Sequence, residues 1–510
     1  MRTKISSVWR NAMSTRTSYR ILHGDRAVFN NYTRYCVGTG RMGLALHKEY
    51  LDQLAYVQSE VGFSHIRGHG LFCDDMAIYH EQPDGTVVYN FTYLDRVFDS
   101  YLALNIRPFV ELGFMPYALA SGTQTIFYWK GNTTPPKDHE KWAELIRALI
   151  RHLINRYGVH EVAAWPVEVW NEPNLPGFWE KADKAAYFRL YAVSAQAVKS
   201  VLPQMRVGGP AICGGEGSLG WIQDFLLFCK ENTLPLDFVT RHLYLGQQPE
   251  KRGQYLYHEM NTPETMRKEA QDTRDIIDSF PEYRGMELHI TEFNTSYHPF
   301  CPTHDTNYNA ALIAAVLAGL GDTCASYSYW TFGDVFEEQG VPDRPFHGGF
   351  GMVANGMIPK PTLWTFQFFA RLHGTPVLKG EDCVVLREED SSYCGVFWNL
   401  CQETREKRTV ECSLPAGDGE WVIVTRVVDE EGCNPLKMWH DLGEHASINR
   451  EEIALIRDSA RPVASSRTIQ AEGGWVTISM DLKENAVVWM ELKKVKRDES
   501  FGYEYPACPR

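Results

Sequence analysis

Eight short β-type runs alternate with helical patterns between residues 36 and 330, and this alternation limits the possible folds most strongly. The runs are rich in β-branched and aromatic residues, which favour strands. The segments between them place apolar residues at the three- and four-residue spacing of a helix face. Strands are expected at residues 36–40, 63–67, 106–112, 167–170, 205–209, 237–241, 287–291 and 325–330. Eight such units predict an α/β fold of the (β/α)8 TIM-barrel type.

The pattern changes after Pro361, where short β-type runs follow one another without intervening helices. Such a series indicates a β-sandwich. We expect a barrel domain over residues 30–360 and an accessory sandwich formed by residues 1–29 and 361–510. A small helical insertion near residues 447–460 interrupts the sandwich. A chain of 510 residues is long enough for two such domains.

Two glutamates follow the fourth and seventh predicted strands, at the end of a barrel where catalytic groups are found. Glu172 lies in Asn171-Glu172-Pro173, and Pro173 cannot continue a hydrogen-bonded ladder. Glu292 ends the seventh run. Either glutamate alone is typical of an ordinary surface loop. Two carboxylates that converge on one cleft are what glycoside hydrolysis requires, because one protonates the leaving oxygen and the other attacks the anomeric carbon or activates water.

A series of motifs resembles glycoside hydrolase family 39, the β-xylosidase branch of the clan A retaining glycosidases. The motifs follow the family order from about residue 35 to residue 365. They are Arg67-Gly-His-Gly70, Glu168-Val-Trp-Asn-Glu-Pro-Asn174, Gly208-Gly-Pro-Ala211, Arg241-His-Leu-Tyr244, Ile290-Thr-Glu-Phe-Asn-Thr-Ser-Tyr297, Tyr329-Trp-Thr-Phe-Gly-Asp-Val-Phe-Glu-Glu338 and Phe346-His-Gly-Gly-Phe-Gly351. Asn-Glu-Pro alone is shared across the clan, whereas the full series is specific.

The resemblance implies an exo-acting retaining β-D-xylosidase that releases xylose from the non-reducing ends of short xylo-oligosaccharides. Glu172 would be the acid/base and Glu292 the nucleophile. Arg67 would either support the carboxylates or contact the sugar. The residues expected to bind substrate are His69, Asn171, His242, Tyr244, Tyr297, Trp330 and Glu337.

Four of these residues have specific expected roles. Asn171 would hold the sugar 2-hydroxyl, where a hydrogen bond strengthens in the transition state. Tyr297 would orient the nucleophile through its hydroxyl, and Trp330 would form an apolar platform under the ring. Glu337 would close the space that a hydroxymethyl group at C5 needs. The family usually has Tyr after the nucleophile, and here the residue is Phe293.

Two alternatives stay open. One is a relative of the same family that acts on an arabinoside, a glucoside or an iduronide, and the other is a non-catalytic sugar-binding relative. The resemblance implies an enzyme without a metal or organic cofactor, and the twelve cysteines show no CxxC pair and no metal-ligand spacing. The net charge of −13 argues against nucleic acid or an anionic membrane as a partner.

Location and assembly are further expectations. The start of the chain has no apolar core of signal-peptide type, and no apolar run is long enough to span a membrane. Together with the scattered cysteines this predicts a cytoplasmic protein in a reducing compartment. The family resemblance, the additional β-domain and the aromatic-bearing tail suggest a homo-oligomer, with a tetramer favoured.

Overall fold

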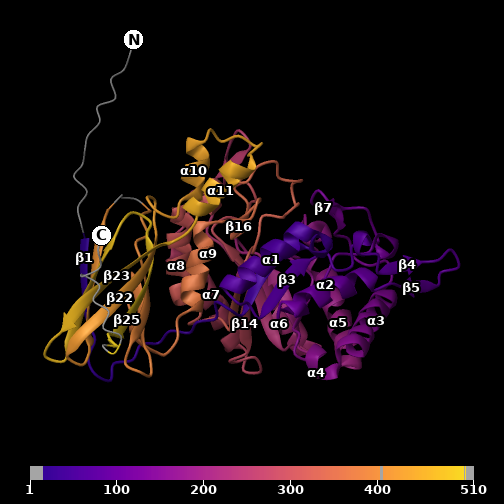
Figure 1. Ribbon diagram of the computed structural model, residues 1–510. Coiled ribbons are helices and arrows are strands. Elements are labelled where there is room, and N and C mark those ends of the chain that lie inside the picture. The colour runs from indigo at the N-terminus through magenta and orange to yellow at the C-terminus, as the bar shows by residue number, and fades with distance from the viewer. Residues whose placement is uncertain (1–14, 403–405, 499, 501–510) are drawn as a thin grey trace, which may run out of the picture. The chain divides into compact units, whose positions relative to one another are not determined.

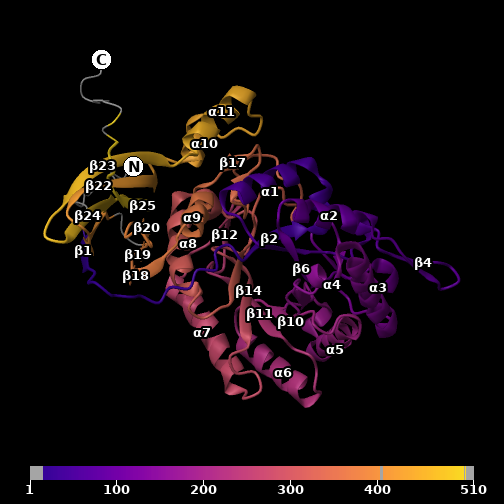
Figure 2. The same ribbon diagram turned by 60° about the horizontal axis from the view of Figure 1, so that its bottom comes forward.

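The protein folds into two compact units, seen in the computed structural model of Figures 1 and 2, which describes residues 15–402, 406–498 and 500. The barrel unit consists of Phe29–Ala370 and Cys433–Arg461. The sandwich unit consists of the described residues up to Val28, of Arg371–Gly432 and of those from Pro462 onward. Among the described residues, no helix combines the length and the apolar character that crossing a bilayer requires.

Eight parallel strands close into a cylinder in the barrel unit, which confirms the predicted fold class. In order around the cylinder they are β2 (Cys36–Arg41), β3 (His65–His69), β6 (Arg107–Leu112), β9 (Val167–Val169), β10 (Val207–Ile212), β11 (Phe238–Tyr244), β14 (Glu287–Asn294) and β15 (Ser326–Tyr329). The cylinder closes where β15 pairs with β2 and Ser328 lies opposite Cys36. Because all eight strands run the same way, their C-terminal ends form one rim.

Helices cover the outside of the cylinder (Figures 1 and 2). They are α1 (Lys48–Glu60), α2 (Thr92–Ala103), α3 (His139–Tyr157), α5 (Lys184–Val201), α6 (Ser218–Glu231), α7 (Pro263–Ser279), α8 (Asn307–Leu320) and α9 (Pro361–Ala370), with a short α4 (Val159–Val162) after α3. Helix α3 shows how the sequence sets such a helix. The Asp138 carboxylate caps its start by accepting from the amides of Glu140 and Lys141, which satisfies donors that have no partner inside the helix.

Small two-stranded sheets form within the loops of the barrel unit. They pair β4 (Tyr79–Glu81) with β5 (Val87–Tyr89), β7 (Thr125–Ile126) with β8 (Gly131–Asn132), β12 (Glu250–Arg252) with β13 (Tyr255–Tyr257), and β16 (Val353–Ala354) with β17 (Ile358–Pro359). The β7–β8 pair belongs to the long loop after β6, at the rim where the strands end.

The boundaries of the two units differ from the predicted ones at two places. We assigned residues 361–370 and the helical segment near 447–460 to the sandwich, but both cluster with the barrel. Helix α9 is buried over Pro361–Phe369 and packs on α8, because it is the eighth helix of the barrel. The insertion forms α10 (Pro435–Asp441) and α11 (Arg450–Ser459), whose Trp439 and Ile456 share a core with Ile358 of the barrel unit.

The sandwich unit contains a three-stranded sheet, β1 (Thr15–Arg20), β21 (Arg408–Pro415) and β24 (Trp475–Leu482). A six-stranded sheet has the order β18 (Thr375–Lys379), β19 (Cys383–Arg387), β20 (Tyr393–Trp398), β25 (Val487–Lys494), β22 (Gly419–Val428) and β23 (Val463–Ala471). Inward-facing side chains from both sheets, such as Val385, Phe397, Val410 and Ile478, form its core. Residues 501–510, which contributed to the assembly prediction, lie outside the described residues.

A buried ion cluster joins three loop segments of the barrel unit. The Lys360 ammonium lies 2.6 Å from Asp305 Oδ1 and 2.7 Å from Asp334 Oδ2, and all three side chains are buried. The same ammonium donates to the carbonyl of Gly349 at 2.8 Å. Asp334 in turn accepts the amide of Gly351 at 2.7 Å. Lys360 therefore fixes the segment that follows β15.

Replacing Lys360 by methionine should destabilise the protein by about 3–5 kcal/mol, because two buried carboxylates lose their counter-charge. The measurement is denaturant unfolding followed by fluorescence. Lys437→Met is the matched control, since Lys437 pairs with Asp441 on the exposed face of α10, and its loss should cost no more than about 0.5 kcal/mol. Equal costs for the two variants would contradict a structural role for the cluster.

Candidate active site

A cavity of about 590 Å³ opens at the C-terminal rim of the barrel. Its walls come from the ends of several strands and the loops that follow them. The strand-end groups are His69, Asn171, Glu172, Tyr244, Glu292 and Trp330. These six residues and Tyr297, seven of those predicted from the sequence, lie around one cavity, in the position typical of TIM-barrel active sites.

Arg67 lies on β3 beneath the cavity and is completely buried. Its Nε donates to Glu168 Oε2 at 2.7 Å and its Nη1 to Glu292 Oε1 at 2.6 Å. Its Nη2 lies 2.9 Å from both Asn171 Oδ1 and Glu111 Oε2. Protein oxygens thus contact all three nitrogens of the guanidinium. Of the two roles expected for Arg67, the geometry therefore favours support of the carboxylates rather than contact with the sugar.

Glu292 lies inside β14, two residues before its end, with its carboxylate held on both sides. Tyr244 donates its hydroxyl to Oε2 at 2.6 Å, opposite the 2.6 Å contact of Arg67 with Oε1. His69 Nε2 lies 3.5 Å from Oε1, and the Nδ1 of the same ring is 2.7 Å from Glu111. A cation and a hydroxyl donor directed at one carboxyl group stabilise its ionised form.

Glu172 has the opposite environment. It follows β9 in a left-handed backbone conformation (φ 44°), and its amide donates to the carbonyl of Ala211. Burial raises the pKa of its carboxyl well above the usual range, and the negative charge of Glu292 raises it further. His242 Nδ1 lies 2.8 Å from Glu172 Oε1, and burial lowers the pKa of His242 well below its usual value. A neutral imidazole therefore shares a hydrogen bond with a carboxyl group that favours its protonated form.

The two glutamates are close together. One carboxylate oxygen of Glu172, one of Glu292 and a ring nitrogen of His242 all lie within 4.8 Å of one another. Carboxyl groups about 5–5.5 Å apart are typical of retaining glycosidases, and about 6.5–9.5 Å of inverting ones. One oxygen of each carboxyl group therefore lies as near to the other as the retaining arrangement requires. The same three atoms could also hold a cation, but the Arg67 guanidinium already contacts Glu292.

The prediction that Tyr297 orients the nucleophile through its hydroxyl is wrong. Tyr297 lines the cavity and is 45% exposed, and its ring packs edge-on against Tyr244. The hydroxyl that reaches Glu292 belongs to Tyr244, which lies on β11 next to β14 in the cylinder. A strand neighbour can reach Glu292 directly, whereas Tyr297 lies three residues beyond the end of β14.

The prediction that Glu337 reaches the sugar is also wrong, because the next residue, Glu338, lines the cavity. Glu337 turns away from the cavity and pairs with Arg41 at 2.8 Å. Glu338 lines the cavity instead, and burial raises the pKa of its carboxyl well above the usual range, with Glu292 and Glu172 adding to the effect. Consecutive glutamates in an irregular loop have no periodicity to show which one faces inward, so the sequence carried no signal for this choice.

Trp330 and His69 form one wall of the cavity, with ring centroids 4.6 Å apart. Phe127 and Phe178 form an apolar wall, and neither was singled out from the sequence. Glu111 and Glu168, which hold Arg67, were also missed as functional residues. Both are acids in the interior of apolar strands, an uncommon position that could have drawn attention to them.

A closed parallel barrel with two nearby glutamates at its C-terminal rim has the architecture of a retaining glycoside hydrolase. The sequence profile of Glycosyl hydrolases family 39 matches residues 23–476. The chain belongs to this family.

Named relatives agree with the family assignment. The chain is 49% identical over 486 residues to a β-xylosidase of Geobacillus stearothermophilus, covering 94% of this chain and 95% of the relative. It is 36% identical over 433 residues to a β-xylosidase of Caldicellulosiruptor saccharolyticus, covering 83% and 87%. The crystal structure of a monomeric β-xylosidase from Caulobacter crescentus superposes with a TM-score of 0.86 at 31% identity, covering 95% and 100%.

The raised pKa of Glu172 predicts a pH-dependent effect of Glu172→Gln on stability. Between the unfolded and folded pKa values the folded state binds more protons at this site, so wild-type stability falls as the pH rises through that interval. The glutamine variant lacks this loss. The difference in melting temperature, variant minus wild type, should therefore become more positive between pH 4.5 and pH 8. Glu231→Gln, at an exposed position on α6, should show no such trend, and a parallel trend in both variants would contradict the assignment.

Proposed function

We propose that the protein is an exo-acting retaining β-D-xylosidase that releases xylose from the non-reducing ends of xylo-oligosaccharides. The observation that carries the proposal is the pair of glutamates in one cavity, one held by Arg67 and Tyr244 and the other kept protonated by burial. The substrate class is supported by the two relatives named β-xylosidase that align with most of this chain.

The geometry supports a double displacement. An oxygen of Glu292 attacks the anomeric carbon while Glu172 gives its proton to the departing glycosidic oxygen, which leaves a glycosyl ester on Glu292. The ester carries no charge, so the repulsion that helps to raise the pKa of Glu172 disappears. Glu172 is then the better base. It takes a proton from water, whose oxygen attacks the anomeric carbon and releases Glu292 as the carboxylate.

The sugar is positioned by groups on opposite sides of the cavity. Asn171 accepts from Arg67 through Oδ1, which leaves its amide nitrogen to donate to the 2-hydroxyl next to the reacting carbon. Trp330 offers an apolar face to the ring. None of the cavity-lining residues in the described part of the chain is Lys or Arg. This composition disfavours an iduronide, whose carboxylate would need a cationic partner.

The protein should prefer an aryl β-xyloside to the corresponding β-glucoside by at least about tenfold in kcat/KM, because rejection of one small group is worth about 1–3 kcal/mol. We assign Glu338 to the space beside C5, so Glu338→Ala should lower this ratio. Glu337→Ala, which removes the neighbouring carboxylate that faces Arg41, should leave the ratio unchanged. Equal rates on both sugars in the wild-type protein would contradict the choice of xylose but not the glycosidase mechanism.

The roles of the two glutamates can be separated with azide and an activated aryl β-xyloside. In Glu292→Ala, azide can enter the space left by the nucleophile and displace the aglycone once, giving an α-xylosyl azide. In Glu172→Ala, the covalent intermediate still forms because the leaving group needs little protonation. Azide then attacks that intermediate in a second inversion, giving a β-xylosyl azide. The product configurations are read by NMR.

Opposite configurations would exchange the two roles. Full residual activity of either variant without azide would remove that glutamate from the mechanism. Wild-type protein with azide is the control and should yield xylose with retained configuration.

We also propose a cytoplasmic location and a homo-oligomer, with a tetramer favoured. No disulfide joins any of the eleven cysteines that the structure describes, which suits a reducing compartment. The assembly proposal depends on the family resemblance and the additional β-domain, and the Caulobacter crescentus relative is described as monomeric. Light scattering at micromolar concentration should give a multiple of the chain mass of 58.3 kDa, and a single species of monomer mass would refute the proposal.

A further inference from the structure

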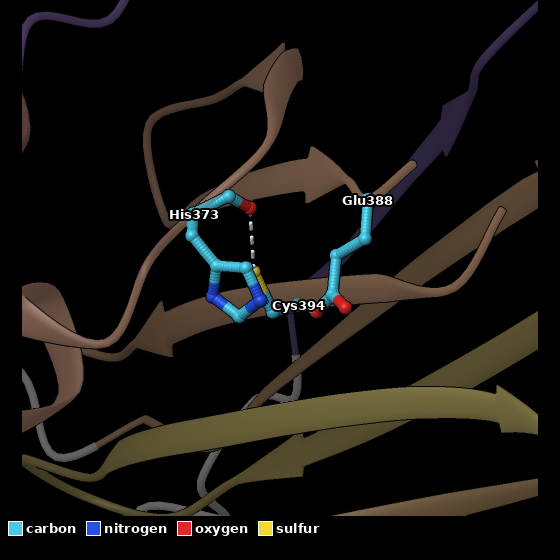
Figure 3. A group of neighbouring side chains, drawn as sticks. All are labelled: His373, Glu388 and Cys394. Atoms are coloured by element: carbon cyan, nitrogen blue, oxygen red, sulfur yellow. Dashed lines mark hydrogen bonds and ion pairs between the residues drawn. The ribbon is translucent and has the colours of Figure 1, made fainter. Parts of the chain in front are cut away.

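Three potential metal ligands meet at one edge of the sandwich unit, His373, Glu388 and Cys394 (Figure 3). His373 precedes β18, Glu388 directly follows β19, and Cys394 lies in β20, so the three residues lie in or beside consecutive strands of the six-stranded sheet. One ligand atom from each residue can be chosen so that all three lie within 4.8 Å of one another. None of these residues belongs to the barrel unit or to its active site.

The imidazole of His373 is held in the tautomer that a metal ligand requires. Its Nδ1 lies 2.8 Å from the carbonyl oxygen of Arg371, and a carbonyl can only accept, so Nδ1 carries the hydrogen. In the neutral ring Nε2 then has a free lone pair, which faces Glu388 Oε1 at 3.3 Å. Histidines that bind metals usually donate their second ring nitrogen to a backbone carbonyl or a carboxylate in this way.

Glu388 is oriented by one oxygen and unsatisfied at the other. Its Oε2 accepts the hydroxyl of Ser392 at 2.9 Å. Its Oε1 is shielded from solvent, makes no hydrogen bond of good geometry within the described residues, and lies 3.3 Å from His373 Nε2. A neutral His373 would thus direct a lone pair at a buried carboxylate oxygen. This arrangement is costly unless a positive charge lies between the two atoms.

Cys394 supplies the third donor from a fully buried position. Its thiol donates to the backbone carbonyl of His373 at 3.3 Å, the contact drawn as a dashed line in Figure 3. Burial raises the pKa of this thiol to about 12, so the sulfur carries its proton when no cation is bound. The thiol and the imidazole are therefore already linked through the main chain of His373.

We propose that His373 Nε2, Glu388 Oε1 and Cys394 Sγ bind a divalent cation of the zinc type. One nitrogen, one oxygen and one sulfur donor suit Zn²⁺, which binds all three with bonds of about 2.0–2.3 Å. Neighbouring ligand atoms in such a tetrahedron are about 3.3–3.8 Å apart. Separations of up to 4.8 Å therefore need to shorten by only about 1 Å.

Charge and protons balance in this step. The cation displaces one proton from the Cys394 thiol to solvent, and the resulting thiolate and the Glu388 carboxylate together offset its two positive charges. The fourth coordination position is left for water, since the His373 side chain is 64% exposed. The cation would tie three strands at the edge of the sheet, so its expected effect is on stability.

The test uses the full-length protein, freed of metal by dialysis against a chelator and titrated with Co²⁺ alone. We expect a thiolate-to-cobalt charge-transfer absorption that saturates at one Co²⁺ per chain and is lost when Zn²⁺ is added. Cys394→Ser should abolish the absorption, and so should His373→Gln. The histidine side chain is largely exposed, so its replacement keeps the test valid if the cysteine variant fails to fold.

Cys213→Ser is the matched control, because Cys213 is the thiol in the active-site cavity near the second cluster of candidate ligands, Glu172, His242 and Glu292. This variant should keep the absorption.

Zn²⁺ should also raise the melting temperature of the wild-type protein by several degrees, and should raise it less in His373→Gln. No thiolate absorption in the wild type, as expected if a protonated His373 simply pairs with Glu388, would overturn the proposal. Absorption lost in Cys213→Ser but kept in His373→Gln would also overturn it.

Discussion

The active site depends on the burial of Arg67 among three carboxylates. Each of Glu111, Glu168 and Glu292 comes from a different strand of the cylinder, and a single guanidinium on β3 contacts all three. Buried carboxylates that lack a counter-charge are protonated or displaced. Arg67 supplies the positive charge that lies among these three carboxylates at the base of the cavity. The same guanidinium fixes Asn171, which immediately precedes Glu172 in the chain.

The contrast between the two glutamates follows from this arrangement. Glu292 has a cation and a hydroxyl donor within 2.6 Å. Glu172 has a neutral histidine and the negative charge of Glu292 near it. Two identical side chains thus have opposite surroundings in one cavity, and differences of this kind are how a site can hold carboxyl groups with different roles. The charge of Glu292 also helps to raise the pKa of Glu172.

The sequence predicted those features that depend on periodicity and on strand ends. Eight alternating units predicted the closed barrel, and residues near the C-terminal ends of parallel strands meet at one rim, which is why Glu172, Glu292 and His242 could be expected to lie close together. The choice between Tyr244 and Tyr297 depended on the separation of neighbouring strands, and that between Glu337 and Glu338 on the course of an irregular loop. Neither is encoded in a local pattern. The ligands His373, Glu388 and Cys394 were missed for a similar reason, since strand pairing alone makes them neighbours.

The most direct test of the account is to trap the covalent intermediate on the wild-type protein. A xyloside with fluorine at C2 and an activated leaving group should form the ester quickly and hydrolyse it slowly, because the fluorine destabilises the positive charge that develops in both transition states. Mass spectrometry of the intact chain should then show one fluoroxylosyl group per chain, and peptide mapping should place it on Glu292. A label on Glu172, or turnover of the xyloside with inversion and no label, would contradict the assignment of Glu292 as the ionised nucleophile held by Arg67.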